Sequence, residues 1–117
     1  MPKIYLVDTG LARKIMTSDY GRRLENAVYL ELKRRGYEIH YLDDEGECDF
    51  LAKRGNGWEA IQSTWELSEN NREREIQVLI RGCQALGMRE GKIITGSQEE
   101  SLSRDGIRIS VIPFWKF

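Results

Sequence analysis

Apolar residues follow a helical period in two long stretches of this chain. The first stretch runs from about residue 20 to residue 35, and its apolar stripe is formed by Leu24, Ala27, Val28 and Leu32. The second stretch begins after Asn70, which we expect to cap the helix, and ends at Gly87. The other apolar runs are short, which is typical of strands.

Three of these short runs follow each other directly. They predict strands at 37–42, 48–54 and 58–65. An acidic turn at 43–47 separates the first two, and the turn sequence Gly55-Asn56-Gly57 separates the second from the third. We therefore expect an antiparallel meander between the two long helices.

The two ends of the chain complete the predicted order. We expect a strand at 3–7 and a short helix at 11–16 before the first long helix. After the second long helix we expect a strand at 92–95, a polar loop at 97–106 and a last strand at 107–114. A meander followed by a helix and a further strand requires a crossover connection, so the fold class is α/β, with a mixed sheet flanked by helices.

Composition and charge exclude some classes of protein. The 117 residues are enough for one compact domain. The 18 basic and 19 acidic residues give a formal net charge of −1, which excludes a polybasic protein whose whole surface attracts phosphate. A nucleic-acid role therefore needs a local patch. The chain also lacks the P-loop motif, so by itself it is not a P-loop ATPase.

Neither a membrane span nor a signal peptide is indicated. No apolar run is long enough to cross a bilayer, and the N-terminus lacks the apolar region of a signal peptide. We therefore expect a cytoplasmic protein with no membrane partner. In that compartment the two cysteines, Cys48 and Cys83, are expected to be buried free thiols.

Three polar residues are candidates for a functional site. Asp49 lies inside an apolar strand, where a carboxylate is costly unless it is paired, hydrogen-bonded or bound to a metal. Gln62 lies in the next strand, and Glu25 lies in the first turns of the first long helix, so the topology allows the three side chains to converge. The alternative roles are structural: Glu25 would only complement the helix dipole, and Gln62 would only satisfy a buried backbone group.

Basic residues cluster on the first long helix, where they are candidates for contacts with nucleic-acid phosphates. The alternative is an ordinary solvated helix face. The apolar C-terminal segment at 114–117 either packs on the sheet or docks on a partner domain. The basic cluster consists of Arg22, Arg23, Lys33, Arg34 and Arg35.

Seven segments, spread over nearly the whole chain, carry a family resemblance: KIYLVDTGLA (3–12), GRRLENAVYLELKRRGYEIHYL (21–42), ECDFL (47–51), AIQSTWEL (60–67), NREREIQVLIRG (71–82), KIITG (92–96) and VIPFWKF (111–117). In this order they resemble the PD-(D/E)XK nuclease superfamily. They are more closely similar to the nuclease-like module at the C-terminus of many archaeal and bacterial AAA+ ATPases of unassigned function.

The resemblance implies a restriction-endonuclease-like αβββαβ core. Residues 1–117 would then be a single nuclease-like domain, with an N-terminal strand and short helix in 1–19 and the core in 20–117. Because the family usually continues upstream of the segment MPKIYLVDTG, we expect a fragment of a longer chain whose partner is an AAA+ ATPase domain.

The resemblance also implies roles for single residues. The helix acid of the family falls on Glu25 and the strand acid on Asp49, whereas the second carboxylate and the lysine of the Glu-x-Lys element fall on Gln62 and Thr64. In active members the carboxylates bind Mg²⁺, which activates water, and the lysine stabilises the developing charge. Glu25, Asp49 and Gln62 would be the metal ligands here, and Mg²⁺ would bind weakly or not at all because Gln62 and Thr64 are uncharged.

Three functions stay open at this point. The first is a nuclease-like domain with a degenerate catalytic site that serves as a DNA-binding or interaction module of an AAA+ ATPase. The second is an active, metal-dependent deoxyribonuclease that uses Glu25, Asp49 and Gln62. The third is a structural domain, such as one that forms a homodimer, with no nucleic-acid role. The uncharged Gln62 and Thr64 favour a protein that is not an enzyme.

Overall fold

The computed structural model describes residues 3–4, 19–41 and 48–117. The predictions for residues 5–18, which include the short helix at 11–16, and for the turn at 43–47 lie outside the described residues. Within the described ranges, no helix is long and apolar enough to cross a membrane.

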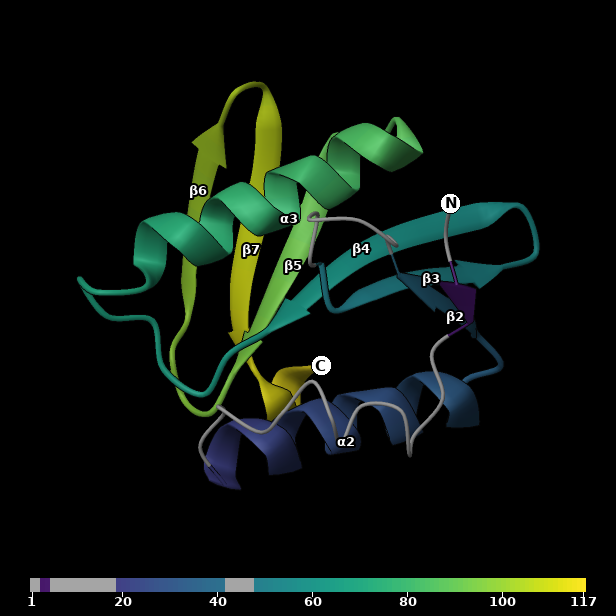
Figure 1. Cartoon of the computed structure of the whole chain (residues 1–117), viewed down its shortest axis with the longest axis horizontal. Helices are drawn as coiled ribbons and strands as arrows, with labels where there is room; N and C mark the ends of the chain where they lie inside the picture. Colours follow the sequence, from purple (N-terminus) through teal and green to yellow (C-terminus); the bar gives the residue numbers. More distant parts are fainter. Residues whose placement is uncertain (1–2, 5–18, 42–47) are drawn as a thin grey trace.

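A seven-stranded mixed sheet forms the centre of the described part of the chain (Figure 1). Its strand order is β1-β2-β3-β4-β5-β7-β6. Strands β2 to β4 pair antiparallel as the predicted meander, and β1 adds antiparallel to β2. Strand β5 pairs parallel with both β4 and β7, and β6 pairs antiparallel with β7. The strands are β1 (Lys3–Ile4), β2 (Glu38–Tyr41), β3 (Phe50–Arg54), β4 (Gly57–Ser63), β5 (Glu90–Thr95), β6 (Glu100–Arg104) and β7 (Ile107–Pro113).

The prediction of a polar loop at 97–106 is wrong, because Glu100–Arg104 forms strand β6. Leu102 is the one apolar residue in this strand, so the alternation is too weak to predict it. The β6–β7 hairpin depends on Asp105 and Gly106, whose φ angles are 56° and 77°. Positive φ at both central residues is what a tight two-residue hairpin turn requires.

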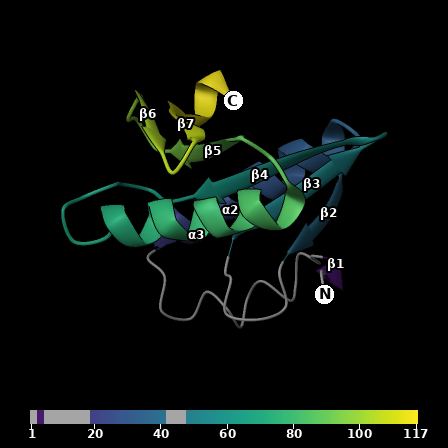
Figure 2. The same cartoon turned by 90° about the horizontal axis from the view of Figure 1, so that it is seen from above.

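Two long helices cover opposite faces of the sheet. Helix α2 (Asp19–Arg34) packs on β2 and β4, and helix α3 (Arg72–Leu86) lies along β4 and β5, as Figure 2 shows. Alternate residues of each strand point to opposite faces, so the strands supply two separate cores. Leu51, Ala60 and Ile93 pack under α3, whereas Phe50, Ile61 and Ile94 pack under α2.

Helix α3 ends at Gly87 as predicted, in a left-handed conformation with φ of 69°. It begins one residue later than predicted, with Asn71 at the N-cap position in place of Asn70. The Asn71 side chain does not cap the helix, because its Oδ1 accepts a hydrogen bond from the backbone N–H of Ser68 instead.

The α3 face of the sheet is tightly packed. A Cβ atom on Gly82 of α3 would lie 2.8 Å from Sγ of Cys48, and one on Gly91 of β5 would lie 2.8 Å from Sγ of Cys83, so neither position has room for a side chain. Both thiols are free and buried, as predicted. Burial raises the pKa of Cys83 to about 11 and also raises the pKa of Cys48.

Candidate functional site

The structure brings Asp49 and Gln62, two of the predicted site residues, into direct contact. Asp49 immediately precedes β3 and Gln62 lies near the end of β4, in strands paired so that Phe50 faces Ile61. The side-chain Oε1 of Gln62 accepts a 2.9 Å hydrogen bond from the backbone N–H of Asp49. Both residues are buried, so this bond satisfies a backbone donor that water does not reach.

Hydrogen bonds from Ser63 hold the carboxylate of Asp49. The Oδ2 atom accepts one bond of 2.9 Å from the backbone N–H of Ser63 and one of 3.0 Å from its hydroxyl. The burial cost that made Asp49 conspicuous in the sequence is thus offset at least partly by hydrogen bonds within the protein.

A third buried polar residue, Glu75 in the first turn of α3, belongs to the same network and was missed in the sequence. The Nε2 group of Gln62 donates a 2.7 Å bond to Oε1 of Glu75, and Nη1 of Arg74 donates a 2.9 Å bond to Oε2. The available signal was position: Glu75 lies four residues before Leu79, at the edge of the apolar stripe. A first-turn glutamate is usually attributed to the helix dipole alone.

The contact with Glu75 gives a physical reason for an amide at position 62. A carboxylate there would place two like charges against each other in buried surroundings, and one of them would take up a proton. The amide has one acceptor oxygen for the N–H of Asp49 and a donor for Glu75, so it matches both neighbours.

Glu25 is also buried, next to the buried Leu24 in α2. Its neighbour Leu24 shares a core with Phe50 and Ile61, which are next to Asp49 and Gln62 in the chain. Strand alternation places Gln62 on the α3 side of β4, where it bonds Glu75. Glu25 therefore approaches from the α2 side, and Gln62 points to the other face.

Thr64 and the acid Glu59 of β4 also have defined places. The backbone N–H of Thr64 donates to the carbonyl of Ile94 at 3.0 Å, so the chain is still paired with β5 just after β4, and the Thr64 side chain is half-buried. Glu59 lies on the face opposite Gln62, where Tyr37 and Lys92 donate hydrogen bonds to it. Burial raises the pKa of Glu59, but the bonds from Tyr37 and Lys92, together with the positive charges of Lys92 and Arg54, bring the net pKa below its usual value.

Several residues of the predicted basic cluster are already in ion pairs. Arg22 pairs with Asp19, and Arg34 and Arg35 both pair with Glu31. The bonds from Arg34 and Arg35 lower the pKa of Glu31 to about 2, so this pairing persists at neutral pH. Arg23 and Lys33 are exposed, and neither has an ion-pair partner among the described residues.

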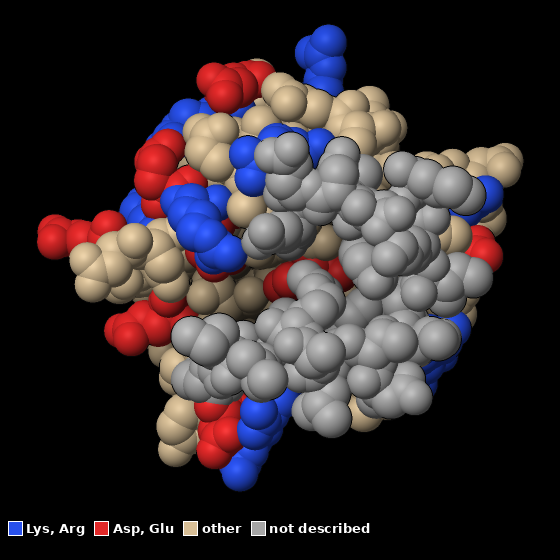
Figure 3. Space-filling model, viewed as in Figure 1, with Lys and Arg blue, Asp and Glu red and all other residues tan. Residues whose placement is uncertain are grey.

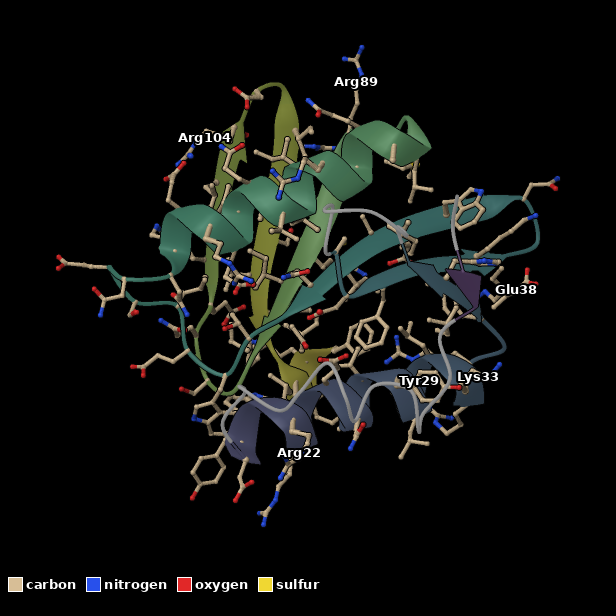
Figure 4. The ribbon with its side chains drawn as sticks, viewed as in Figure 1. Arg22, Tyr29, Lys33, Glu38, Arg89 and Arg104 are labelled. Atoms are coloured by element: carbon tan, nitrogen blue, oxygen red, sulfur yellow. The ribbon has the colours of Figure 1, made fainter. Side chains whose placement is uncertain are left out.

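The surface around these residues is mixed in sign. Arg22 and Lys33 lie at opposite ends of α2 (Figure 4), so the cluster extends along the whole helix and is not one compact patch. On the described part of the face in Figure 3, acidic and basic side chains lie side by side. The cations available for phosphate contacts are therefore scattered.

The C-terminal segment partly packs on the protein, which was one of its two predicted roles. Phe114 and Phe117 pack against the core under α2, and the guanidinium of Arg35 lies 4.5 Å from the centre of the Phe117 ring. Trp115, in the short 3-10 helix Phe114–Lys116, is 69% exposed.

A cavity of about 740 Å³ lies away from this network. Its polar lining comes from strands β4 to β7 on the face opposite α3, and includes Glu59, Lys92 and Arg108. Lys92 pairs with Glu59, and Arg108 pairs with Glu90. Asp49, Gln62 and Glu75 do not line it, so the cavity and the buried polar network are separate features.

Comparison with known proteins identifies relatives but no function. An uncharacterized protein of Haemophilus influenzae is 32% identical over 97% of this chain and 28% of its own length. An uncharacterized protein of Methanocaldococcus jannaschii is 36% identical over 98% of this chain and 29% of its own length. The chain thus spans less than a third of these relatives. No protein-family model and no solved structure matches it.

Proposed function

We propose that the chain is a nuclease-like domain of the PD-(D/E)XK type with a degenerate catalytic site, which serves as a DNA-binding or interaction module of an AAA+ ATPase. The order α2-β2-β3-β4-α3-β5 supports this proposal, because it has the αβββαβ sequence of elements that the resemblance implies. The position of Asp49 and Gln62 at adjacent strand ends agrees with the same pattern.

The observation that carries the proposal is the hydrogen bonding of the Gln62 side chain. Its oxygen is bonded to the N–H of Asp49 and its nitrogen to Glu75, so both ends of the amide are used inside the protein. A residue engaged in this way acts as a structural bridge at the position where an active member has a metal-binding carboxylate. Thr64 supplies a hydroxyl but no cation for a developing charge.

We propose that Mg²⁺ binds weakly or not at all at this site, and the donor groups of the described residues support this. Among them, no group of three or more histidine, cysteine, aspartate or glutamate side chains is arranged to hold a metal ion. Mg²⁺ prefers an octahedral set of oxygens that includes charged carboxylates. The proposed function therefore includes no metal-dependent step.

An active endonuclease is the second candidate, and Glu75 is the observation that favours it. This buried carboxylate lies one hydrogen bond from Gln62, close to where the second acid of an active site would be. If the Gln62 amide released it, Glu75 would place a second carboxylate near Asp49.

A nicking assay on supercoiled plasmid, with Mg²⁺ or Mn²⁺ titrated, separates these candidates. We expect no nicking above that of an Asp49→Ala control. Metal-dependent nicking that Asp49→Ala abolishes would establish the endonuclease and overturn the degenerate-site proposal.

Measuring DNA affinity over a range of salt concentrations tests whether DNA is a partner of this domain. A DNA-binding module should lose affinity steeply as salt rises, because phosphate contacts release counterions. An affinity too weak to measure even at low salt would remove the DNA role and leave an interaction or dimerisation domain.

A further inference from the structure

Two exposed aromatic rings stack on each other between the start of α2 and the segment after β4. The rings of Tyr20 and Trp65 are 5.1 Å apart between centroids and inclined by only 19°. Tyr20 is 58% exposed and Trp65 is 44% exposed, although rings of this size usually bury most of their surface. One ring comes from the first turn of α2, and the other comes from the segment that follows β4.

The protein backbone supports the inner end of this stack. A Cβ atom on Gly96 would lie 2.8 Å from each of three ring atoms of Trp65, so the indole lies directly over the glycine. The backbone N–H of Gly96 also donates to the carbonyl of Trp65 at 3.1 Å. The indole is thus held between Gly96 and Tyr20, and the stack ends at the exposed ring of Tyr20.

The two rings come from segments of the chain that also carry candidate site residues. Trp65 follows Gln62 by three residues, and Tyr20 precedes Glu25 by five residues, which is about one and a half helical turns. Arg23 lies one turn after Tyr20 on the same side of α2 and is exposed, with no ion-pair partner in the described part of the chain. An aromatic face and a cation are therefore neighbours on the surface of the first turns of α2.

We propose that this stack receives an unpaired base, so that the nucleic acid recognised by the domain contains a single-stranded segment. The inference rests on the DNA-binding function proposed above. Every base has a flat face that stacks on an aromatic ring, and Arg23 is placed to contact a neighbouring phosphate. Inside an intact duplex both faces of each base are covered by the neighbouring bases. No base face is then free to stack on the Tyr20 ring.

Binding of a fluorescent oligothymidylate to the 117-residue chain, compared with a duplex of the same length, tests the proposal. We expect tighter binding of the single strand. Tyr20→Ala should weaken single-strand binding by about fivefold or more, which is the lower end for loss of one stacked base. Duplex affinity and the salt dependence of binding should not change, because no phosphate contact is removed.

Matched variants separate stacking from other effects. Tyr20→Phe keeps the ring and should bind like the unsubstituted chain, and Leu30→Ala, at another exposed apolar position of α2, should have no effect. Gly96→Ala should displace the indole and lower single-strand affinity. Quenching of tryptophan fluorescence by the oligonucleotide should be lost in Trp65→Phe.

The outcomes distinguish failure of this inference from failure of the proposed function. If the chain binds neither single-stranded nor duplex DNA, the stacking proposal falls together with the DNA-binding role, and only the interaction role of the proposed function is left. If it binds DNA with salt dependence but Tyr20→Ala leaves single-strand affinity unchanged, only the stacking proposal is overturned. Should Tyr20→Ala not fold, Tyr20→Leu retains the apolar bulk without an aromatic face and must show the same selective loss.

Discussion

Strand β4 carries a bonded polar side chain on each of its two faces, Gln62 on one and Glu59 on the other. These two residues differ in burial and in charge. Toward α3, Gln62 is buried and uncharged, and its amide bridges Asp49 and Glu75. On the opposite face, Glu59 is half-exposed, charged and paired with Lys92 beside a cavity lined by polar and apolar residues. The comparison indicates that burial decides which side chain is tolerated: a carboxylate is acceptable where water and a cation reach it, and an amide where another carboxylate is already buried.

The largest loss of stability is expected when a charged side chain replaces the amide on the buried face of β4. Gln62→Glu places a second carboxylate against Glu75, and we expect it to cost about 3 kcal/mol of the free energy of unfolding at pH 7. The pKa of one of the two carboxyls should rise, so the penalty is present above that pKa and is relieved as the pH falls through it. Urea unfolding at pH 7 and pH 5 measures both effects.

Exchanging the two residues provides the control. In Gln62→Glu with Glu75→Gln the pair again has one charge and one amide, so most of the lost stability should return. If the double variant is no more stable than Gln62→Glu alone, repulsion between the two carboxylates is not the cause.

The packed α3 face should also protect its two thiols. Because the pKa of Cys83 is about 11, its thiolate fraction at pH 8 is far below that of an ordinary cysteine. We expect alkylation by iodoacetamide to be about 100-fold slower in the folded protein than in urea. Rapid labelling without denaturant would show that this face opens easily.

Substitution by alanine should have very different effects on stability at the two faces of the sheet. Gly82→Ala forces a Cβ atom against Cys48 and should cost about 2 kcal/mol, in the range seen for overpacked cores. Ser103→Ala, on the wall of the open cavity, should change stability by less than about 0.5 kcal/mol. Thermal or urea unfolding of the two variants measures the contrast, and equal losses would contradict it.

A small effect is also expected at the half-exposed ion pair of Glu59 and Lys92. Glu59→Gln should cost below about 1 kcal/mol, and less at high salt, because half-exposed ion pairs contribute little. Since the pKa of Glu59 is lowered in the folded state, its contribution is present above the usual carboxyl pKa and is lost as the pH falls through the folded value. The difference from the unsubstituted chain should therefore shrink on acidification, which is visible in unfolding curves from pH 7 to pH 3.

The difference between these faces also explains how far the sequence could predict the structure. The helices α2 and α3 and the meander have strong periodicity and clear turn residues, so they were predictable. Strand β6 was not, because a single leucine leaves no alternation to detect. Asp49 stood out because an acid in an apolar strand is costly. Glu75 did not, because its burial depends on how closely α3 approaches β4, a distance that local sequence does not encode.

The hairpin turn at Asp105 and Gly106 bears on the kinetics of folding. Strands β6 and β7 are joined by two residues, so their pairing closes almost no loop and can form within microseconds. The parallel pairing of β4 with β5 has to wait until the intervening chain, including α3, has folded back. We therefore expect the β6–β7 hairpin to be structured early in folding. In refolding experiments, the kinetic φ-value, which reports how far a residue's contacts are formed in the folding transition state, should be clearly higher for a substitution at Gly106 than for one at Gly82. The β6–β7 hairpin would then serve as the template on which β5, and after it β4, add as parallel strands.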